Sequence, residues 1–261
     1  MSRLSPSFGQ DPEAAAWLAP RLTGPWGHVT SVVPDRFPAY VRILHPVETG
    51  DGQTVPWSAV AEAAGTHIHP LAQWNRVAPR RDNHQDWWRG LNPEEGHLPQ
   101  TSLAPLTKVL ARHTSNPGDC WFGLWAGYGW IHGSPSVAFT YPDDSQRQPE
   151  ESPVPPAFPA EVTDPTRLLH LPARDYLLGR GPIQAASGIG HQLTPNWFIP
   201  QSPNLLWPQD RAWCIATEID FDSTLVAGNH QLITELVDHP HLEVWQVQPH
   251  DSLQHNADHI N

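Results

Sequence analysis

The residues with the clearest chemical potential are three carboxylates in the segment WCIATEIDFD, residues 213–222. Glu218, Asp220 and Asp222 alternate there with apolar residues. In a single β-strand they would share one face, at intervals of about 6.5–7 Å, because side chains alternate between the two faces. Carboxylates at this spacing repel one another unless they are solvated, paired with arginine or bridged by a cation.

Three interpretations of this acidic row are open at the level of sequence. The row is the solvent-facing side of an amphipathic strand, which requires polar residues in any case. Alternatively it is a recognition surface for a basic partner. In the third interpretation it supplies oxygen ligands to a divalent metal such as Mg²⁺ or Ca²⁺, or acts in acid–base chemistry.

A second candidate is the tetrapeptide THIH at residues 66–69, in which His67 and His69 would lie on one side of a strand. A zinc site needs a third ligand and an open position, and the chain offers His84, His97, Glu218 or Asp220. Pro70 follows directly, and the chain holds 16 histidines, so loop or packing roles are the competing interpretation. The motifs HExxH and CxxC are absent from the sequence.

Tryptophan and arginine cluster in the first half of the chain. The cluster comprises Trp74, Trp87, Trp88, Trp121, Trp125, Trp130, Arg76, Arg80, Arg81 and Arg89. Such residues can stack on a base, a sugar or an arginine-rich peptide, whereas Trp121 and Trp125 fit a buried strand. Adjacent residues cannot both face inward on a regular strand. Trp87, Trp88 and Arg89 are therefore expected to be partly exposed and to contact a ligand or partner.

The usual nucleophile motifs are missing. The sequence has no G-x-S-x-G, and the glycines around Ser187 lack the spacing of a phosphate-binding loop. Cys120 and Cys214 lie in apolar segments, where a buried thiol is unreactive. We therefore assign no catalytic residue.

Composition narrows the classes of partner. The 261 residues carry 15 Lys+Arg and 27 Asp+Glu, a formal charge of 15 − 27 = −12. Nucleic acid is not expected as a partner, because phosphate contacts need a basic surface. No apolar run is long enough to span a bilayer, the N-terminus lacks the apolar stretch of a secretory signal, and two cysteines make no disulfide framework. These features predict a cytoplasmic protein.

The helices and strands that position these residues are predicted from the periodicity of apolar residues and from the residues that favour turns and helix ends. We predict helices over 11–22, 57–64, 102–113 and 230–238, and strands over 40–44, 119–128, 174–182, 213–222 and 242–247. Residues 142–165 contain seven prolines and form a proline-rich insert. The fold class is α+β, with a mixed or largely antiparallel sheet and a few short helices. We treat 1–261 as one domain, with two lobes, 1–141 and 166–261, as the alternative.

Four segments carry a family resemblance: HPLAQW (69–74), CWFGLWAGYGW (120–130), RDYLLGRGPI (174–183) and the Trp-rich stretch 202–228. They resemble an uncharacterised family of actinobacterial proteins with no assigned activity. The resemblance implies a bacterial cytoplasmic setting and transfers no catalytic residue.

The sequence thus predicts a non-catalytic, acidic interaction protein, of an immunity or regulatory type, that binds a basic partner through Glu218, Asp220 and Asp222. The alternative is a metal-dependent hydrolase that combines His67 and His69 with these carboxylates and a divalent cation. The sequence leaves the oligomeric state undetermined.

Overall fold

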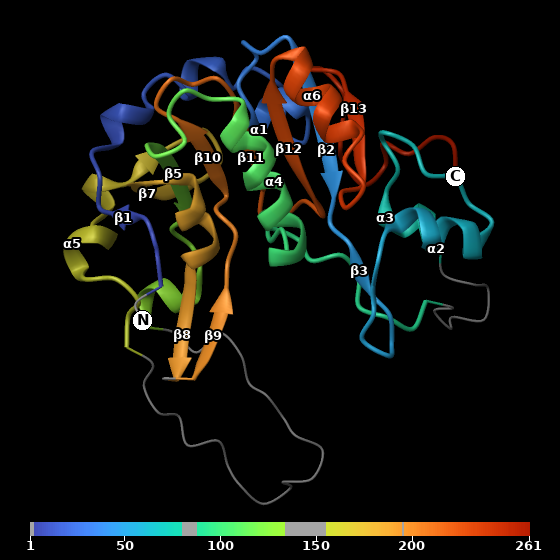
Figure 1. Ribbon diagram of the computed structural model, residues 1–261, viewed down its shortest axis with the longest axis horizontal. Helices are drawn as coiled ribbons and strands as arrows, with labels where there is room; N and C mark the ends of the chain where they lie inside the picture. The colour runs from blue at the N-terminus through green and yellow to red at the C-terminus, as the bar shows by residue number, and fades with distance from the viewer. Residues whose placement is uncertain (1–2, 80–87, 134–154, 195) are drawn as a thin grey trace, which may run out of the picture.

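The computed structural model describes residues 3–79, 88–133, 155–194 and 196–261, and its core is a nine-stranded sheet (Figure 1). Every strand pair in this sheet is antiparallel. The strand order is β1 (Ser7–Phe8), β7 (Asp175–Gly181), β5 (Cys120–Trp125), β10 (Leu205–Pro208), β11 (Cys214–Ala216), β12 (Ser223–Gly228), β2 (Ala39–Leu44) and β13 (Val244–Val247), with β6 (Leu169–His170) pairing with β7. The α+β class predicted from the sequence is confirmed.

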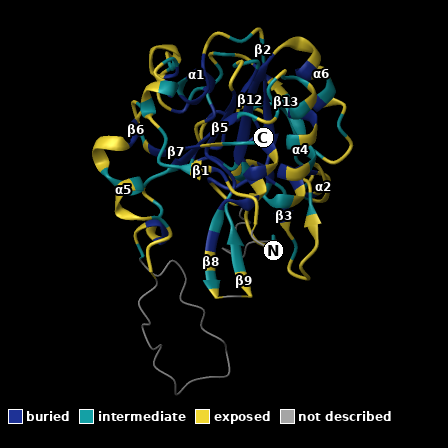
Figure 2. Ribbon diagram, turned by 60° about the vertical axis from the view of Figure 1, so that its left-hand side comes forward, coloured by how far each residue is buried: buried dark blue, intermediate teal, exposed yellow. Residues whose placement is uncertain are grey.

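Each face of the sheet has its own apolar core. On one face, α4 (Gln100–Arg112) and α6 (His230–Val237) pack on Val41, Ile43 and other residues of the strands. On the other face, two 3₁₀ helices, η1 (Pro12–Ala15) and η2 (Ala19–Arg21), and the short helix α1 (Val29–Val32) belong to the segment that covers Tyr40 and its neighbours. Figure 2 shows β2, β5 and β12 almost wholly buried between these layers.

A smaller unit packs beside the sheet around Trp57, which is fully buried. It contains the β3–β4 hairpin (Val47–Glu48 and Thr54–Val55), α2 (Trp57–Ala64) and α3 (Trp74–Val77). Glu243 stabilises the start of α2, because its carboxylate accepts hydrogen bonds from the backbone N–H groups of Trp57 and Ser58. The remaining elements are η3 (Gly129–His132), α5 (Ala160–Thr163), η4 (Pro165–Arg167), η5 (Ile183–Gly188) and the projecting hairpin β8 (Gly190–Thr194) and β9 (Trp197–Pro200) (Figure 1).

Most of the predicted elements are confirmed. The strands predicted over 40–44, 119–128, 174–182 and 242–247 are β2, β5, β7 and β13, and the helices over 57–64, 102–113 and 230–238 are α2, α4 and α6. Gly65 ends α2 with a φ of 74°, as its left-handed preference predicts. Ser102 lies inside α4 and does not cap it, because the helix already begins at Gln100.

The predicted strand over 213–222 is wrong. β11 ends at Ala216, the chain turns where the Phe221 N–H donates to the Glu218 carbonyl over 3.0 Å, and β12 returns antiparallel from Ser223. All six residues of β12 are buried, so this strand shows no alternation of polar and apolar residues and its sequence pattern does not indicate a strand. β12, α6 and β13 form a split β-α-β unit, with β2 between the two strands and antiparallel to both.

The predicted helix over 11–22 is also wrong, since the segment forms η1 and η2. Pro20 lacks the N–H that a continuous helix would need. Asp11 caps η1 as expected. Of the proline-rich insert, residues 142–154 lie outside the described part of the chain, and α5 and η4 occupy part of the rest.

The chain before and the chain after the insert share one sheet, since β5 lies between β7 and β10. Among the described helices, none has the length and apolar character needed to cross a membrane.

The N-cap of α6 gives a test of the local energetics. The Asn229 Oδ1 atom accepts a hydrogen bond from the Leu232 N–H over 2.8 Å. Asn229→Ala removes this acceptor, and the free energy of unfolding in a urea titration should fall by about 1 kcal/mol. Asn229→Asp keeps the acceptor and serves as the control. Equal losses in both variants would show that the cap is not the cause.

Candidate functional site

A cleft of about 590 Å³ lies beside the turn that joins β11 to β12. Six segments that are separate in sequence line it: residues 26–27, Arg42 of β2, residues 73–75 at the start of α3, residues 92–95, the start of β12 with the turn before it, and the C-terminal residues 253–255. We call it the acidic cleft, and its chemically important lining residues are Trp26, Arg42, Trp74, Glu95, Asp220 and Asp222.

Arg42 forms part of the lining and is almost fully buried, with 1% of its surface exposed. Its guanidinium donates to Ser223 Oγ over 2.8 Å, to the Ala72 carbonyl over 2.7 Å and to Asp222 Oδ1 over 2.9 Å. Burial lowers the pKa of Arg42 and raises the pKa of Asp222, and the charge of each residue opposes the shift of the other. The pair joins β2, β12 and the segment before α3 into one rigid wall.

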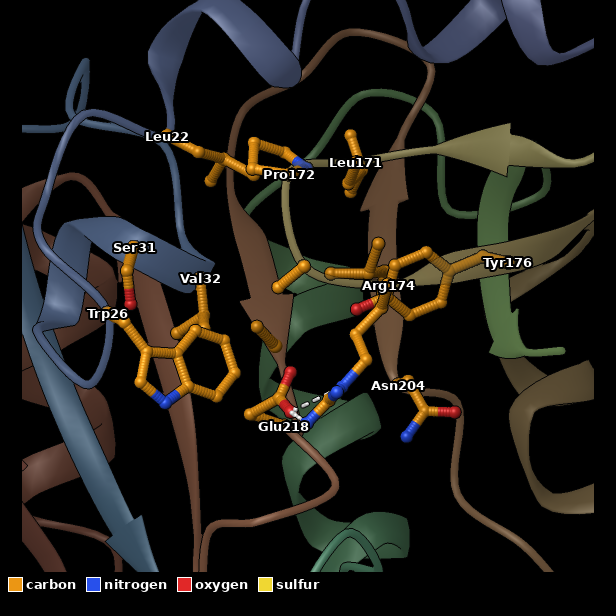
Figure 3. A pocket seen from close by; sticks show the side chains of 13 residues that line it. Leu22, Trp26, Ser31, Val32, Leu171, Pro172, Arg174, Tyr176, Asn204 and Glu218 are labelled. Atoms are coloured by element: carbon orange, nitrogen blue, oxygen red, sulfur yellow. Dashed lines mark hydrogen bonds and ion pairs between the residues drawn. The ribbon is translucent and has the colours of Figure 1, made fainter. Parts of the chain in front are cut away.

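Arg174 organises the second pair of acids, Glu218 and Asp220, and Figure 3 shows its pairing with Glu218. Its Nε atom donates to Glu218 Oε1 over 3.1 Å, and its Nη2 atom also pairs with Asp220. Its guanidinium carbon lies 5.3 Å from the centre of the Trp26 ring, so the cation stacks on an indole. Burial raises the pKa of Glu218, and Arg174 opposes this shift.

A small cavity of about 20 Å³ lies beside the Arg174–Glu218 pair, with Tyr176 and Asn204 on its lining (Figure 3). That volume has room for about one water molecule. Trp26 lines both this cavity and the acidic cleft, so it stands between the two.

Glu95 has no ion pair or side-chain hydrogen bond with any described residue, and it is exposed. Partial burial raises the pKa of Glu95, and the charges of Asp222 and Asp220 raise it further. Four carboxylates at and beside the cleft (Glu95, Glu218, Asp220, Asp222) face two guanidinium groups (Arg42, Arg174), so the excess is 4 − 2 = two negative charges.

A buried histidine holds the segment that carries Glu95. His45 Nδ1 donates to the Glu94 carbonyl over 2.6 Å, and His45 Nε2 accepts from Thr224 Oγ1 over 2.9 Å. Thr217 Oγ1, at 2.8 Å from Thr224 Oγ1, extends this chain of hydrogen bonds to the turn after β11. Complete burial lowers the pKa of His45 to about 3, so the ring is neutral.

Gly96 allows the segment to approach the acidic turn. Its N–H donates to the Phe221 carbonyl over 3.0 Å, and its φ is 71°. A Cβ atom at this position would lie 2.8 Å from the backbone of Ile219. Glu95 is therefore held beside the turn that carries Asp220 and Asp222.

The predicted outward-facing row of acids is not formed. Glu218 is 4% exposed and paired with Arg174, and the side chain of Asp222 is 19% exposed and paired with Arg42. The side chain of Asp220 is 57% exposed. The acids diverge because the strand ends at Ala216 and residues 218–221 form a turn.

His67 and His69 anchor the C-terminal residues. His69 Nε2 lies 3.0 Å from Asp258 Oδ1, while the backbone N–H and carbonyl of His67 bond to the side-chain amide of Asn261. Within residues 3–79, 88–133, 155–194 and 196–261, no group of three or more His, Cys, Asp or Glu residues is arranged to hold a metal ion.

Of the predicted aromatic contacts, Trp87 lies outside the described residues. Trp88 packs edge-on against Trp74 with ring centres 5.6 Å apart, and its Nε1 donates to the Leu91 carbonyl over 3.2 Å. Trp88 therefore supports a tryptophan of the cleft without lining the cleft itself. Arg89 is exposed and is also absent from the lining.

The two cysteines are buried and free, as expected for packing residues. Burial raises the pKa of Cys120 to about 12, and burial also raises the pKa of Cys214. Both thiols are therefore protonated and unreactive at neutral pH.

Sequence reasoning missed Trp26, Arg42, Glu95 and Arg174. Only Arg42 gave a usable signal, because a charged residue inside the apolar run YVRIL must find a buried partner. No known protein-family model, curated protein or solved structure matches the chain. The resemblance to an actinobacterial family thus stays a prediction.

The Arg42–Asp222 pair leads to a prediction for stability. Arg42→Met leaves the carboxylate of Asp222 without its buried partner, and the free energy of unfolding should fall by about 3–5 kcal/mol. Arg42→Met combined with Asp222→Asn should recover part of this loss, because no unpaired charge remains. Denaturant titration of the three proteins measures both effects. A double variant less stable than Arg42→Met would contradict this interpretation.

His45 predicts an acid sensitivity. The unfolded chain takes up a proton near pH 6.5, whereas folded His45 stays neutral down to about pH 3. The stability that His45 provides above pH 6.5 is therefore lost as the pH falls. Between pH 7 and pH 5, the wild type should lose about 2 kcal/mol more than His45→Gln, whose amide can donate and accept in place of the ring. Urea titrations at pH 7 and pH 5 measure the free energy of unfolding of both proteins. If the wild type and His45→Gln lose the same amount between these pH values, His45 is not a neutral buried residue.

Proposed function

We propose that the protein binds a basic partner by accepting a cationic side chain in the acidic cleft, between Trp26 and Trp74. The observation that carries this proposal is the unpaired carboxylate of Glu95, whose pKa is raised by burial and by the neighbouring charges of Asp222 and Asp220. A cation placed there relieves this repulsion and adds charge-assisted hydrogen bonds.

The size and lining of the cleft support this proposal. Its volume of about 590 Å³ lies within the range of ligand pockets. Trp26 is 45% exposed and offers an indole face to a cation. The amides of Gln73, Asn75 and Asn92 add neutral hydrogen-bonding groups to the lining. The net charge of −12 favours fast association with a basic protein.

The biological setting is part of the proposal. We infer an immunity-type or regulatory protein of the bacterial cytoplasm that masks a basic surface of its partner. The proposed contact residues are Asp220, Asp222 and Glu95, with Trp88 supporting Trp74. The alternative, a metal-dependent hydrolase, has less support, because His67 and His69 bond to Asn261 and Asp258 near the C-terminus and not to Glu218, Asp220 or Asp222.

Isothermal titration calorimetry with a defined probe tests the proposal. The probe is the capped peptide Gly-Gly-Arg-Gly-Gly, and the matched uncharged probe carries citrulline in place of arginine. We expect the arginine peptide to bind more tightly than the citrulline peptide. Glu95→Gln should weaken arginine binding roughly tenfold, which corresponds to about 1.4 kcal/mol. Glu62→Gln, an exposed acid on α2, is the control and should leave binding unchanged.

The pH dependence of the affinity for the arginine peptide, measured by the same calorimetry, is a second test of the proposal. Protonation of Glu95 removes one negative charge, so arginine binding should weaken as the pH falls through the raised pKa of Glu95. Glu95→Gln should flatten this dependence. Equal binding of the arginine and citrulline peptides, or equal effects of Glu95→Gln and Glu62→Gln, would rule out the cleft as a cation site.

A further inference from the structure

Arg174 shows how the protein itself holds a guanidinium beside the cleft. The group stacks on Trp26, with its carbon 5.3 Å from the ring centre, and pairs with Asp220 and Glu218. An indole face and a carboxylate of this kind are also what a cation entering the acidic cleft would contact. Trp26 and Asp220 both line the cleft, so Arg174 and such a cation share two contact residues.

The backbone that carries Arg174 is a short surface turn. The Leu171 N–H donates to the Arg174 carbonyl over 3.0 Å, which closes the turn between β6 and β7. Pro172 and Ala173 are exposed, while the side chain of Arg174 is 23% exposed. A further hollow of about 490 Å³ is lined by the same turn and by Trp125. The side chain of Arg174 therefore has space in which to change its position.

The energetic cost of losing Arg174 as a partner differs between the carboxylates of Glu218 and Asp220. The side chain of Glu218 is 3% exposed, so loss of its partner would leave a buried charge at high energetic cost. The side chain of Asp220 is 57% exposed, so water can replace Arg174 there at little cost. A competitor can thus take Asp220 and the face of Trp26 while Arg174 stays on Glu218.

We propose that Arg174 is an internal competitor in the acidic cleft, and that an arginine of the partner displaces it from Trp26 and Asp220. This inference rests on the proposed function and specifies its ligand class as a guanidinium. A planar guanidinium can stack on the indole and meet a carboxylate with two parallel hydrogen bonds, whereas the ammonium of lysine is a compact point charge. The cleft therefore selects arginine over lysine.

Arg174→Lys is the sharpest variant, because it keeps the charge and a partner for Glu218 but removes the planar group that stacks on Trp26. We expect the affinity for the peptide Gly-Gly-Arg-Gly-Gly to rise three- to tenfold in Arg174→Lys. The peptide with lysine in place of arginine should gain less than twofold. The matched control is Arg180→Lys, which changes an arginine that stacks on Trp121 and pairs with Asp119 outside the cleft.

Nuclear magnetic resonance of the wild-type protein gives a reading that does not depend on any variant. Addition of the arginine peptide should shift the Arg174 Nε–H signal, and the citrulline peptide should not. If the arginine peptide binds in a Glu95-dependent manner while this signal stays fixed and Arg174→Lys binds like the wild type, the competitor role is overturned and the proposed function stands. Absence of Glu95-dependent binding would overturn both.

Discussion

The structure depends on the requirement that a buried guanidinium find hydrogen-bond acceptors inside the protein. Arg42 lies in β2, between β12 and the edge strand β13, with 1% of its surface exposed, and its donors reach Ser223, Asp222 and the carbonyl of Ala72. Removing such a charge from water is costly unless each donor finds an acceptor. This requirement brings β2, β12 and the chain before α3 together. It also positions the carboxylate of Asp222, which pairs with Arg42 through Oδ1 and lines the cleft.

The walls of the cleft depend on the C-terminal residues. The Leu253 N–H donates to the Gly27 carbonyl over 2.7 Å, and the Gln254 side chain donates to the Trp26 carbonyl over 2.8 Å. Asp258 anchors the end of the chain. Although burial alone would raise the pKa of Asp258, its hydrogen bonds from Asn261, from the backbone of Ile260 and from His69 lower it. Trp26 is thus positioned by residues from the opposite end of the sequence.

Two levels of electrostatics contribute to the proposed function in different ways. The net charge of −12 acts over long distances and is screened by salt beyond about 10 Å. The local excess of carboxylates acts inside the cleft, next to low-dielectric protein, where interactions between charges are stronger. The global charge accelerates encounter with a basic protein, while Glu95, Asp220 and Trp26 determine which chemical group is held.

The sequence alone determined most of the local elements, although it did not give the break between β11 and β12. Apolar periodicity and end signals such as Gly65 and Asn229 placed α2 and α6, because these forces act between residues a few positions apart. Only the tertiary structure decided which carboxylates face solvent. Arg42 and Asp222 are 180 positions apart, and Arg174 and Glu218 are 44 apart. No local pattern specifies such partners, since an ion pair depends on distance in space, which the completed sheet sets.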